Sequence, residues 1–424
     1  MMNQALFTGT KNTAARLTTV LFASIALSAC GGGSSSSGNS GSTANQLSNF
    51  QAADTVIGQA NFVDSNANQG GSLAANTLSA PTAIALYEKQ LFINEYGNSR
   101  IAGFSALPNQ NDMTADFVLG QPDFTSASTG TSQKALNKPA DIAIGADHLA
   151  VADKENNRVL LYNTPPTSGP TSPDVVIGQA DFTSDSASCT RATLDQPQAV
   201  AITPDGKLIV ADNKNNRVLI WNNLPTSNGE DADLVLGQDN FTECDPNGPS
   251  GTAASGTFYG PAGVWSDDDR LIITDASNNR ALIWNSFPTS NFPPADVVLG
   301  QGDFTHTAKN DANQDGSSGQ PSSSTLSRPT GVDFNGTQLT ISDGRNHRVL
   351  IWEGLPTANF EPANVVLGQG DFSHNTRNDD DQDGSIDPAA SARTLYYPAG
   401  VRFFDEGLLV TDEVNHRVLI YRLQ

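Results

Sequence analysis

Two short sequence marks recur six times each along this 424-residue chain, and they restrict its fold more than any other feature. The first is a Gly-Gln pair that ends an apolar run, with its glutamine at Gln59, Gln121, Gln179, Gln238, Gln301 and Gln369. The second is Asn-x-Arg or a close variant, with its arginine at Arg100, Arg158, Arg217, Arg280, Arg348 and Arg417. Both advance in phase by about 58 to 69 residues, a period typical of radial or solenoid repeats.

The third copy shows what one repeat contains. Short apolar strands are expected over residues 197–202, 208–212, 217–221 and 233–238, with turn residues between them. The first turn contains Asp205-Gly206, a pair that tolerates positive φ and is typical of hairpins. Hairpin turns argue against a solenoid. Six units of four antiparallel strands therefore predict an all-β fold, a six-bladed β-propeller.

The two ends of the repeated region predict how the ring closes. Residues 54–59 read as a fourth-type strand that has no blade of its own, and residues 417–421 read as a third-type strand with no fourth strand after it. If the N-terminal strand completes the C-terminal blade, both exposed sheet edges disappear together.

The repeat resembles a known family. Pro398-Ala399-Gly400-Val401 followed by Asp412 to Val418, and the same pattern at 329–332 and 343–349, are similar to the NHL repeat. The resemblance covers the chain from about Asp54 to the C-terminus and implies a propeller. It does not specify a function, because NHL-type propellers serve as enzymes, sensors and RNA-binding proteins.

The N-terminal residues predict export and lipid attachment. Residues 1–29 carry Lys11 and Arg16 before a short apolar run, which ends in Leu27-Ser28-Ala29-Cys30. This resembles a bacterial lipoprotein signal with Cys30 as the acylated residue, and an ordinary secretory signal is the alternative. Residues 30–49 are a Gly/Ser-rich tether, and 50–424 are the folded propeller. The expected location is the outer membrane, facing the periplasm or the cell surface.

Charge and cysteine content narrow the partners. The formal net charge of −22 repels the phosphate backbones of nucleic acids, so nucleic acid is not expected to bind. The membrane contact is expected through the lipid alone, and the protein is expected to be monomeric.

Cys189 and Cys244 lie in the same loop of two consecutive repeats, where they form either a disulfide or two free thiols.

An acid and an arginine recur together around the second turn of each repeat. Because the set is present in every copy, we interpret it as structural rather than catalytic. The first copy is expected to use Asn94 in place of the acid. The other copies contain Asp153 and Arg158, Asp212 and Arg217, Asp275 and Arg280, Asp343 and Arg348, and Asp412 and Arg417.

Two loops, 306–327 and 374–397, are longer than their counterparts and carry a cation-binding pattern. The later one contains Asp379, Asp381, Asp383 and Asp387, and the earlier one contains Asp311, Asn313 and Asp315. Their Asp-x-Asp-x-Asp-Gly spacing resembles EF-hand-like and dockerin-like loops and predicts Ca²⁺, although neither has the bidentate glutamate. A solvated acidic turn is the alternative.

The five histidines offer little for catalysis. His347 and His416 occupy a turn position filled by Asn in other copies. His306 and His374 are matched across neighbouring repeats, and a transition metal held between them is a lesser alternative to a simple surface position.

These features favour a lipid-anchored binding or scaffold module that recognises an envelope protein, peptide or glycan through Ca²⁺-organised loops. The alternative, implied by the resemblance, is a propeller enzyme, either a lyase or a lactonase-like hydrolase, with its site in the central channel. The lyase type holds a metal with histidines, and none lies on the expected innermost strands. Asp141, Asp333 and Arg402 are the charged residues expected near the starts of those strands. Enzyme activity thus remains undecided, and the binding module is favoured.

Overall fold

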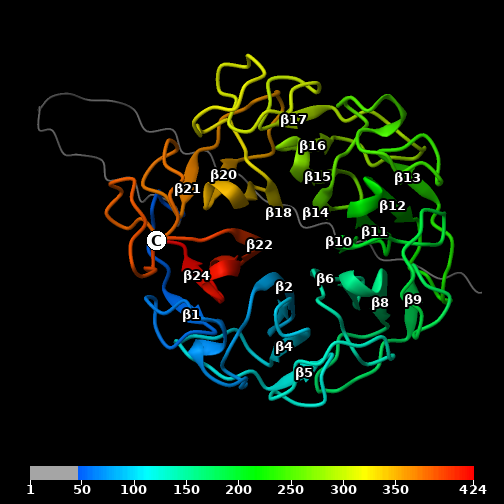
Figure 1. Ribbon diagram of the computed structural model, residues 1–424, viewed down its shortest axis with the longest axis horizontal. Coiled ribbons are helices and arrows are strands. Elements are labelled where there is room, and N and C mark those ends of the chain that lie inside the picture. The colour runs from blue at the N-terminus through cyan, green and yellow to red at the C-terminus, as the bar shows by residue number, and fades with distance from the viewer. Residues whose placement is uncertain (1–45) are drawn as a thin grey trace, which may run out of the picture. The chain divides into compact units, whose positions relative to one another are not determined.

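Six four-stranded antiparallel sheets form the part of the chain that the computed structural model describes, residues 46–424 (Figure 1). The first blade contains β2 (Pro81–Tyr87), β3 (Gln90–Glu95), β4 (Arg100–Phe104) and β5 (Phe117–Leu119), and the second contains β6 (Asp141–Gly145), β7 (His148–Asp153), β8 (Arg158–Tyr162) and β9 (Val175–Ile177). The third contains β10 (Pro197–Ile202), β11 (Leu208–Asp212), β12 (Arg217–Trp221) and β13 (Leu234–Leu236), and the fourth contains β14 (Pro261–Ser266), β15 (Leu271–Asp275), β16 (Arg280–Trp284) and β17 (Val297–Leu299).

The last two blades follow the same plan. The fifth contains β18 (Pro329–Phe334), β19 (Gln338–Asp343), β20 (Arg348–Glu353) and β21 (Val365–Leu367), and the sixth contains β22 (Pro398–Phe404), β23 (Gly407–Asp412), β24 (Arg417–Arg422) and β1 (Thr55–Ile57). Short 3₁₀ helices occupy turns at η1 (Ala67–Gly70), η2 (Lys154–Asn156), η3 (Asn213–Asn215), η4 (Gly248–Ser250), η5 (Ala276–Asn278), η6 (Gly344–Asn346) and η7 (Glu413–Asn415). Within residues 46–424, no helix has the length and apolar character needed to cross a membrane.

The innermost strands β2, β6, β10, β14, β18 and β22 each contact the next, and β22 contacts β2, so the six blades close into a ring (Figure 1). The predicted six-bladed β-propeller is confirmed. The predicted closure is confirmed as well, because β1 pairs with β24 and places Val56 opposite Leu419.

Residues ahead of β1 add to this closure. Leu47 is buried in the sixth-blade core, and the backbone of Gln46 exchanges two hydrogen bonds with that of Gln424. Contacts of the described residues thus extend at least four residues ahead of position 50.

The hydrophobic core lies between neighbouring blades. Each of its clusters takes side chains from two adjacent sheets, as where Phe92 and Ile101 of the first blade pack with Leu149 and Val151 of the second. The middle strands are therefore buried on both faces, which is why their sequences are apolar without alternation.

A buried acid–arginine pair ties the loops of every blade to its sheet. In the second blade the Arg158 Nε atom donates to the Asp153 carboxylate at 2.8 Å, and both side chains are fully buried. The other nitrogens of Arg158 donate to backbone carbonyls of the loops entering and leaving the blade. The same pairs join Asp212 to Arg217, Asp275 to Arg280, Asp343 to Arg348 and Asp412 to Arg417.

The first blade corrects the sequence-based assignment. Its acid is Glu95, which accepts a hydrogen bond from the Nε atom of Arg100 at 2.6 Å. Asn94, the residue expected there, lies one position earlier in β3 and therefore on the opposite side of the strand, where it donates to Thr82 and to the carbonyl of Pro139.

Candidate functional site: the loop face and the mouth of the central channel

One face of the propeller carries the turns between second and third strands together with the loops that connect successive blades; we call it the loop face. Exposed large apolar side chains collect there. Among the described residues such side chains are Val63, Tyr259, Ile386 and Val414, with exposed fractions of 54, 45, 54 and 36 %. All four lie in segments of this face and none on the opposite one. The exposed large apolar side chains of the described residues are thus confined to one face.

The acidic loop before β22 is built around Asp379. This residue is fully buried, and its carboxylate accepts hydrogen bonds from the backbone N–H groups of Asp383 and Gly384. Gly384 has φ of +87°, which glycine adopts without strain. The resulting turn brings carboxylate oxygens of Asp379, Asp381 and Asp387 within 4.8 Å of one another. Asp383, the fourth predicted ligand, instead accepts the backbone N–H of Ser385.

The matching loop before β18 has the same turn but not the same cluster. Asp311 is fully buried and accepts the N–H groups of Asp315 and Gly316. Asn313 donates its amide to Asp315, and Gly319 stands where Asp387 stands in the later loop. In residues 46–424, only the later loop gathers three acidic, histidine or cysteine ligand atoms.

His306 and His374 do not form a shared site. Each ring Nδ1 atom is bonded to the aspartate three residues earlier, Asp303 at 2.8 Å and Asp371 at 2.7 Å. Both histidines are thus engaged within their own loops.

The two downstream cysteines, by contrast, are joined. Cys189 and Cys244 form a disulfide with Cα atoms 6.5 Å apart, which links two consecutive inter-blade loops on the loop face.

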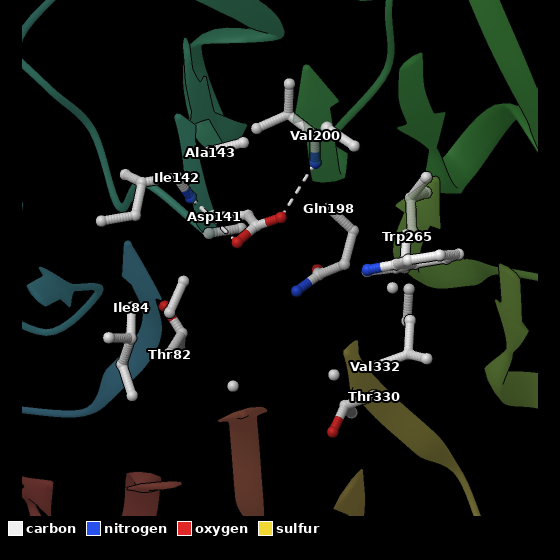
Figure 2. Close-up of a pocket in the computed structure, with 18 of the residues that line it drawn as sticks. Thr82, Ile84, Asp141, Ile142, Ala143, Gln198, Val200, Trp265, Thr330 and Val332 are labelled. Atoms are coloured by element: carbon white, nitrogen blue, oxygen red, sulfur yellow. Dashed lines mark hydrogen bonds between the residues drawn. The ribbon is translucent and has the colours of Figure 1, made fainter. Parts of the chain in front are cut away.

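The central channel encloses a cavity of about 730 Å³ lined by the innermost strands. Figure 2 shows Asp141, Gln198, Trp265 and Thr330 around it. Both oxygens of Asp141 accept backbone hydrogen bonds at 2.9 Å, from Ile142 and from Val200 of the next blade. Burial raises the pKa of Asp141 to about 7.

Asp333 and Arg402, the other charged residues expected near the channel, differ in their positions. Arg402 lines the cavity, whereas Asp333 is buried beside it. The Asp333 carboxylate accepts the backbone N–H of Phe403 in the next blade and a hydrogen bond from Arg402. Asp141 and Asp333 thus join neighbouring blades, and none of the described residues lining the cavity is a histidine.

The loop-face mouth of the channel carries charged residues that the sequence reasoning missed. Lys154 and Glu413, each the first residue of a second turn, line the cavity with Arg328, which directly precedes the first proline of β18. Tyr96 and Tyr397 complete the mouth. The sequence shows that both positions vary from copy to copy beside a repeated acid or a repeated proline, but it does not show that they meet.

The residue before the proline that leads into each innermost strand has a left-handed backbone. A side chain in the preceding blade accepts its N–H group, as Asn279 does for Arg328 at 2.9 Å and His347 for Tyr397 at 3.1 Å. His416 closes this ring by accepting the N–H of Ala80. The φ values are 45° at Ala80, 49° at Lys138, 49° at Gln196, 64° at Gly260, 53° at Arg328 and 58° at Tyr397.

Comparisons with known proteins agree with this architecture. The family model of the NHL repeat matches residues 194–221, which include β10, β11 and β12 of the third blade. This match and the six-bladed fold confirm the resemblance seen in the sequence. No curated protein matches the chain.

Solved structures with similar chains include Kuenenia stuttgartiensis hydrazine synthase and a nidogen/laminin complex. The first is 12 % identical with a TM-score of 0.42, over 83 % of this chain and 98 % of that one. The second is 14 % identical with a TM-score of 0.40, over 73 % of this chain and 96 % of that one.

Proposed function

We propose that this propeller is a lipid-anchored binding module of the cell envelope whose loop face captures an envelope protein or peptide. The observation that carries the proposal is the confinement of Val63, Tyr259, Ile386 and Val414 to that face. Apolar side chains exposed on one side of a ring, above a rigid scaffold, suit a protein partner better than a glycan. The acidic surface disfavours nucleic acid as the partner.

The anchor in this proposal is Cys30, which lies outside the described residues. Acylation at Cys30 and the following Gly/Ser-rich segment would hold the propeller near the outer membrane while leaving its orientation free.

Ca²⁺ is proposed to organise the loop face at Asp379, Asp381 and Asp387. Carboxylate oxygens are the ligands that Ca²⁺ prefers, and three of them converge here on a turn fixed by the buried Asp379. Ile386 lies between Ser385 and Asp387 in the same loop. An ion bound there would therefore fix the position of an exposed apolar contact residue.

Capture from solubilised envelopes tests the proposal. The full-length protein, recovered in detergent with Ca²⁺ present, should retain one or a few specific partners. Ile386→Ser and Val414→Ser together should weaken that capture about tenfold, because exposed apolar anchors dominate protein interfaces. Lys89→Ser, in the turn between β2 and β3 on the opposite face, is the control and should have no effect.

A chelator in the same experiment separates the two parts of the proposal. Loss of capture with the chelator would support the role of Ca²⁺. Unchanged capture would contradict that role but would leave the loop face as the binding surface. Equal loss in the Lys89→Ser control, or recovery of a glycan without any protein, would contradict the proposed partner.

A further inference from the structure

The loop-face mouth of the channel concentrates hydrogen-bond donors that point to a ligand. The Lys154 Nζ atom donates to the Gln198 side-chain oxygen at 2.8 Å. Because the side-chain oxygen of Gln198 accepts this bond, its amide N–H₂ group is free to face the cavity, into which Figure 2 shows the side chain extending. On the other side, the Arg328 Nε atom donates to the Tyr397 hydroxyl at 2.9 Å. The terminal nitrogens of Arg328 make no hydrogen bond to any described residue.

Glu413 lies near enough to Lys154 and Arg328 for their charges to lower its pKa, but no acid that lines the cavity forms a hydrogen bond with either cation. Asp141 uses both oxygens on backbone N–H groups, and Glu413 makes no hydrogen bond or ion pair with a described residue. Lys154 is half-buried, and burial lowers the pKa of its amine, whereas the charges of Glu155 and Glu413 act in the opposite direction. A partly desolvated cation without a hydrogen-bonded carboxylate favours an acidic guest.

The backbone conformation at Arg328 is the one that all six residues at this place in the repeat adopt. It has φ of 53°, a left-handed conformation that glycine adopts without strain. The fourth blade has Gly260 at the equivalent place. Because Ala80, Lys138, Gln196 and Tyr397 share the conformation, it belongs to the repeat, and what distinguishes Arg328 is a cationic side chain that lines the cavity.

We propose that this mouth binds a small carboxylic acid, such as a sugar acid or an organic acid, with Lys154 and Arg328 as counter-charges. The amide of Gln198 and the Tyr397 hydroxyl would donate to its remaining oxygens. Guanidinium and ammonium groups make strong charge-assisted hydrogen bonds to carboxylates. A cavity of about 730 Å³ has the size of small-molecule sites. This ligand is separate from the protein partner of the loop face.

Calorimetry on the full-length protein in detergent tests the proposal. Galacturonate and citrate are the acidic probes, galactose is the neutral one, and inorganic phosphate is the competing anion. The acids should bind and galactose should not. Arg328→Gln and Lys154→Gln should each weaken binding about tenfold or more, since a hydrogen bond to a charged group is lost. Arg328→Lys should restore part of it, and Lys89→Gln, on the opposite face, should leave it unchanged.

Four outcomes would overturn the proposal: no binding of either acid, binding of galactose as tight as that of galacturonate, binding of phosphate as tight as that of the acids, or binding unaffected by the Arg328 and Lys154 variants. Envelope capture is tested at Ile386 and Val414, neither of which lines the cavity. Its success or failure therefore does not depend on this result.

Discussion

The second turn of every blade contains two kinds of residue, and comparing them separates structure from function. In the third blade the turn begins with Asp212, continues with Asn213 and ends at Arg217. The acid and the arginine repeat in all six blades and are buried against each other. The residue that directly follows the acid differs in every blade, and it lines the cavity in all but the fifth blade; it is Lys154 in the second blade and Glu413 in the sixth. Repeated residues hold the ring together, and the positions that vary are those where we propose that a ligand binds.

The strongest test of this comparison changes both kinds of residue in one turn. Arg217→Ala should lower the free energy of unfolding by about 3–5 kcal/mol, because it leaves the Asp212 carboxylate buried without its partner. Asn213→Ala is the matched control. It loses one hydrogen bond to the carbonyl of Pro261 and should cost about 1 kcal/mol. Urea unfolding measures the loss of stability in each variant, and equal losses would contradict the difference proposed between the two kinds of residue.

The parts of the fold that the sequence predicted are those fixed by local, repeated chemistry. Apolar strands, Asp-Gly turns and the unpaired end strands required a closed ring. The one misplaced acid shows the limit of this reasoning. In every other blade the acid stands five residues before the arginine, and counting back from Arg100 reaches Glu95 rather than Asn94. A shift of one residue reverses the side of a strand.

The channel mouth was missed for a different reason. Lys154, Arg328 and Glu413 belong to three different blades and meet only because the ring closes. No local pattern connects residues so far apart. Likewise, the two acidic loops look alike in sequence, and the structure separates them by Asp387 in one and Gly319 in the other.

A second test uses a position where the sixfold pattern itself varies. His347 accepts the N–H of Tyr397 as a neutral ring, and burial lowers its pKa to about 4. Below about pH 6.5 the His347 ring is protonated in the unfolded chain but stays neutral in the native state. The free energy of unfolding therefore falls as the pH drops from about 6.5 to about 4. The loss should total roughly 2–3 kcal/mol.

His347→Asn is the matched variant, since Asn fills this position in the second, third and fourth blades. It should keep the hydrogen bond and remove most of this pH dependence. Urea midpoints measured at pH 7 and pH 4 give the difference, and a variant as acid-sensitive as the parent would show that other groups cause the loss.

The two acidic loops provide the third test. Asp379→Asn should weaken the proposed Ca²⁺ binding about tenfold or more, because one of three converging carboxylates is lost. Asp311→Asn makes the same change in the loop that lacks the third carboxylate and should leave Ca²⁺ binding unchanged. Calorimetric titration with Ca²⁺ measures the affinity of the parent and of both variants. Equal losses in the two variants would mean that both loops bind the ion, and no binding by the parent would exclude it.

The smallest expected effect concerns the acid that shares the mouth with the two cations. Burial raises the pKa of Glu413 to about 7, while Lys154 and Arg328 hold it lower than burial alone would. Tyr96, whose pKa is itself raised, faces the same space. Above pH 7 the ionised Glu413 competes with a ligand carboxylate for the cations, so galacturonate should bind several-fold more tightly at pH 6 than at pH 8.

Glu413→Gln removes the competing charge at nearly constant shape. Its affinity for galacturonate should be nearly the same at pH 6 and pH 8 and should match or exceed that of the parent at pH 6. The carboxyl group of galacturonate titrates well below this pH range and stays ionised throughout, so its own titration does not change the affinity. A pH dependence that persisted in the variant would assign the effect to another group, and binding that grew weaker in the variant would mean that Glu413 contacts the ligand rather than competing with it.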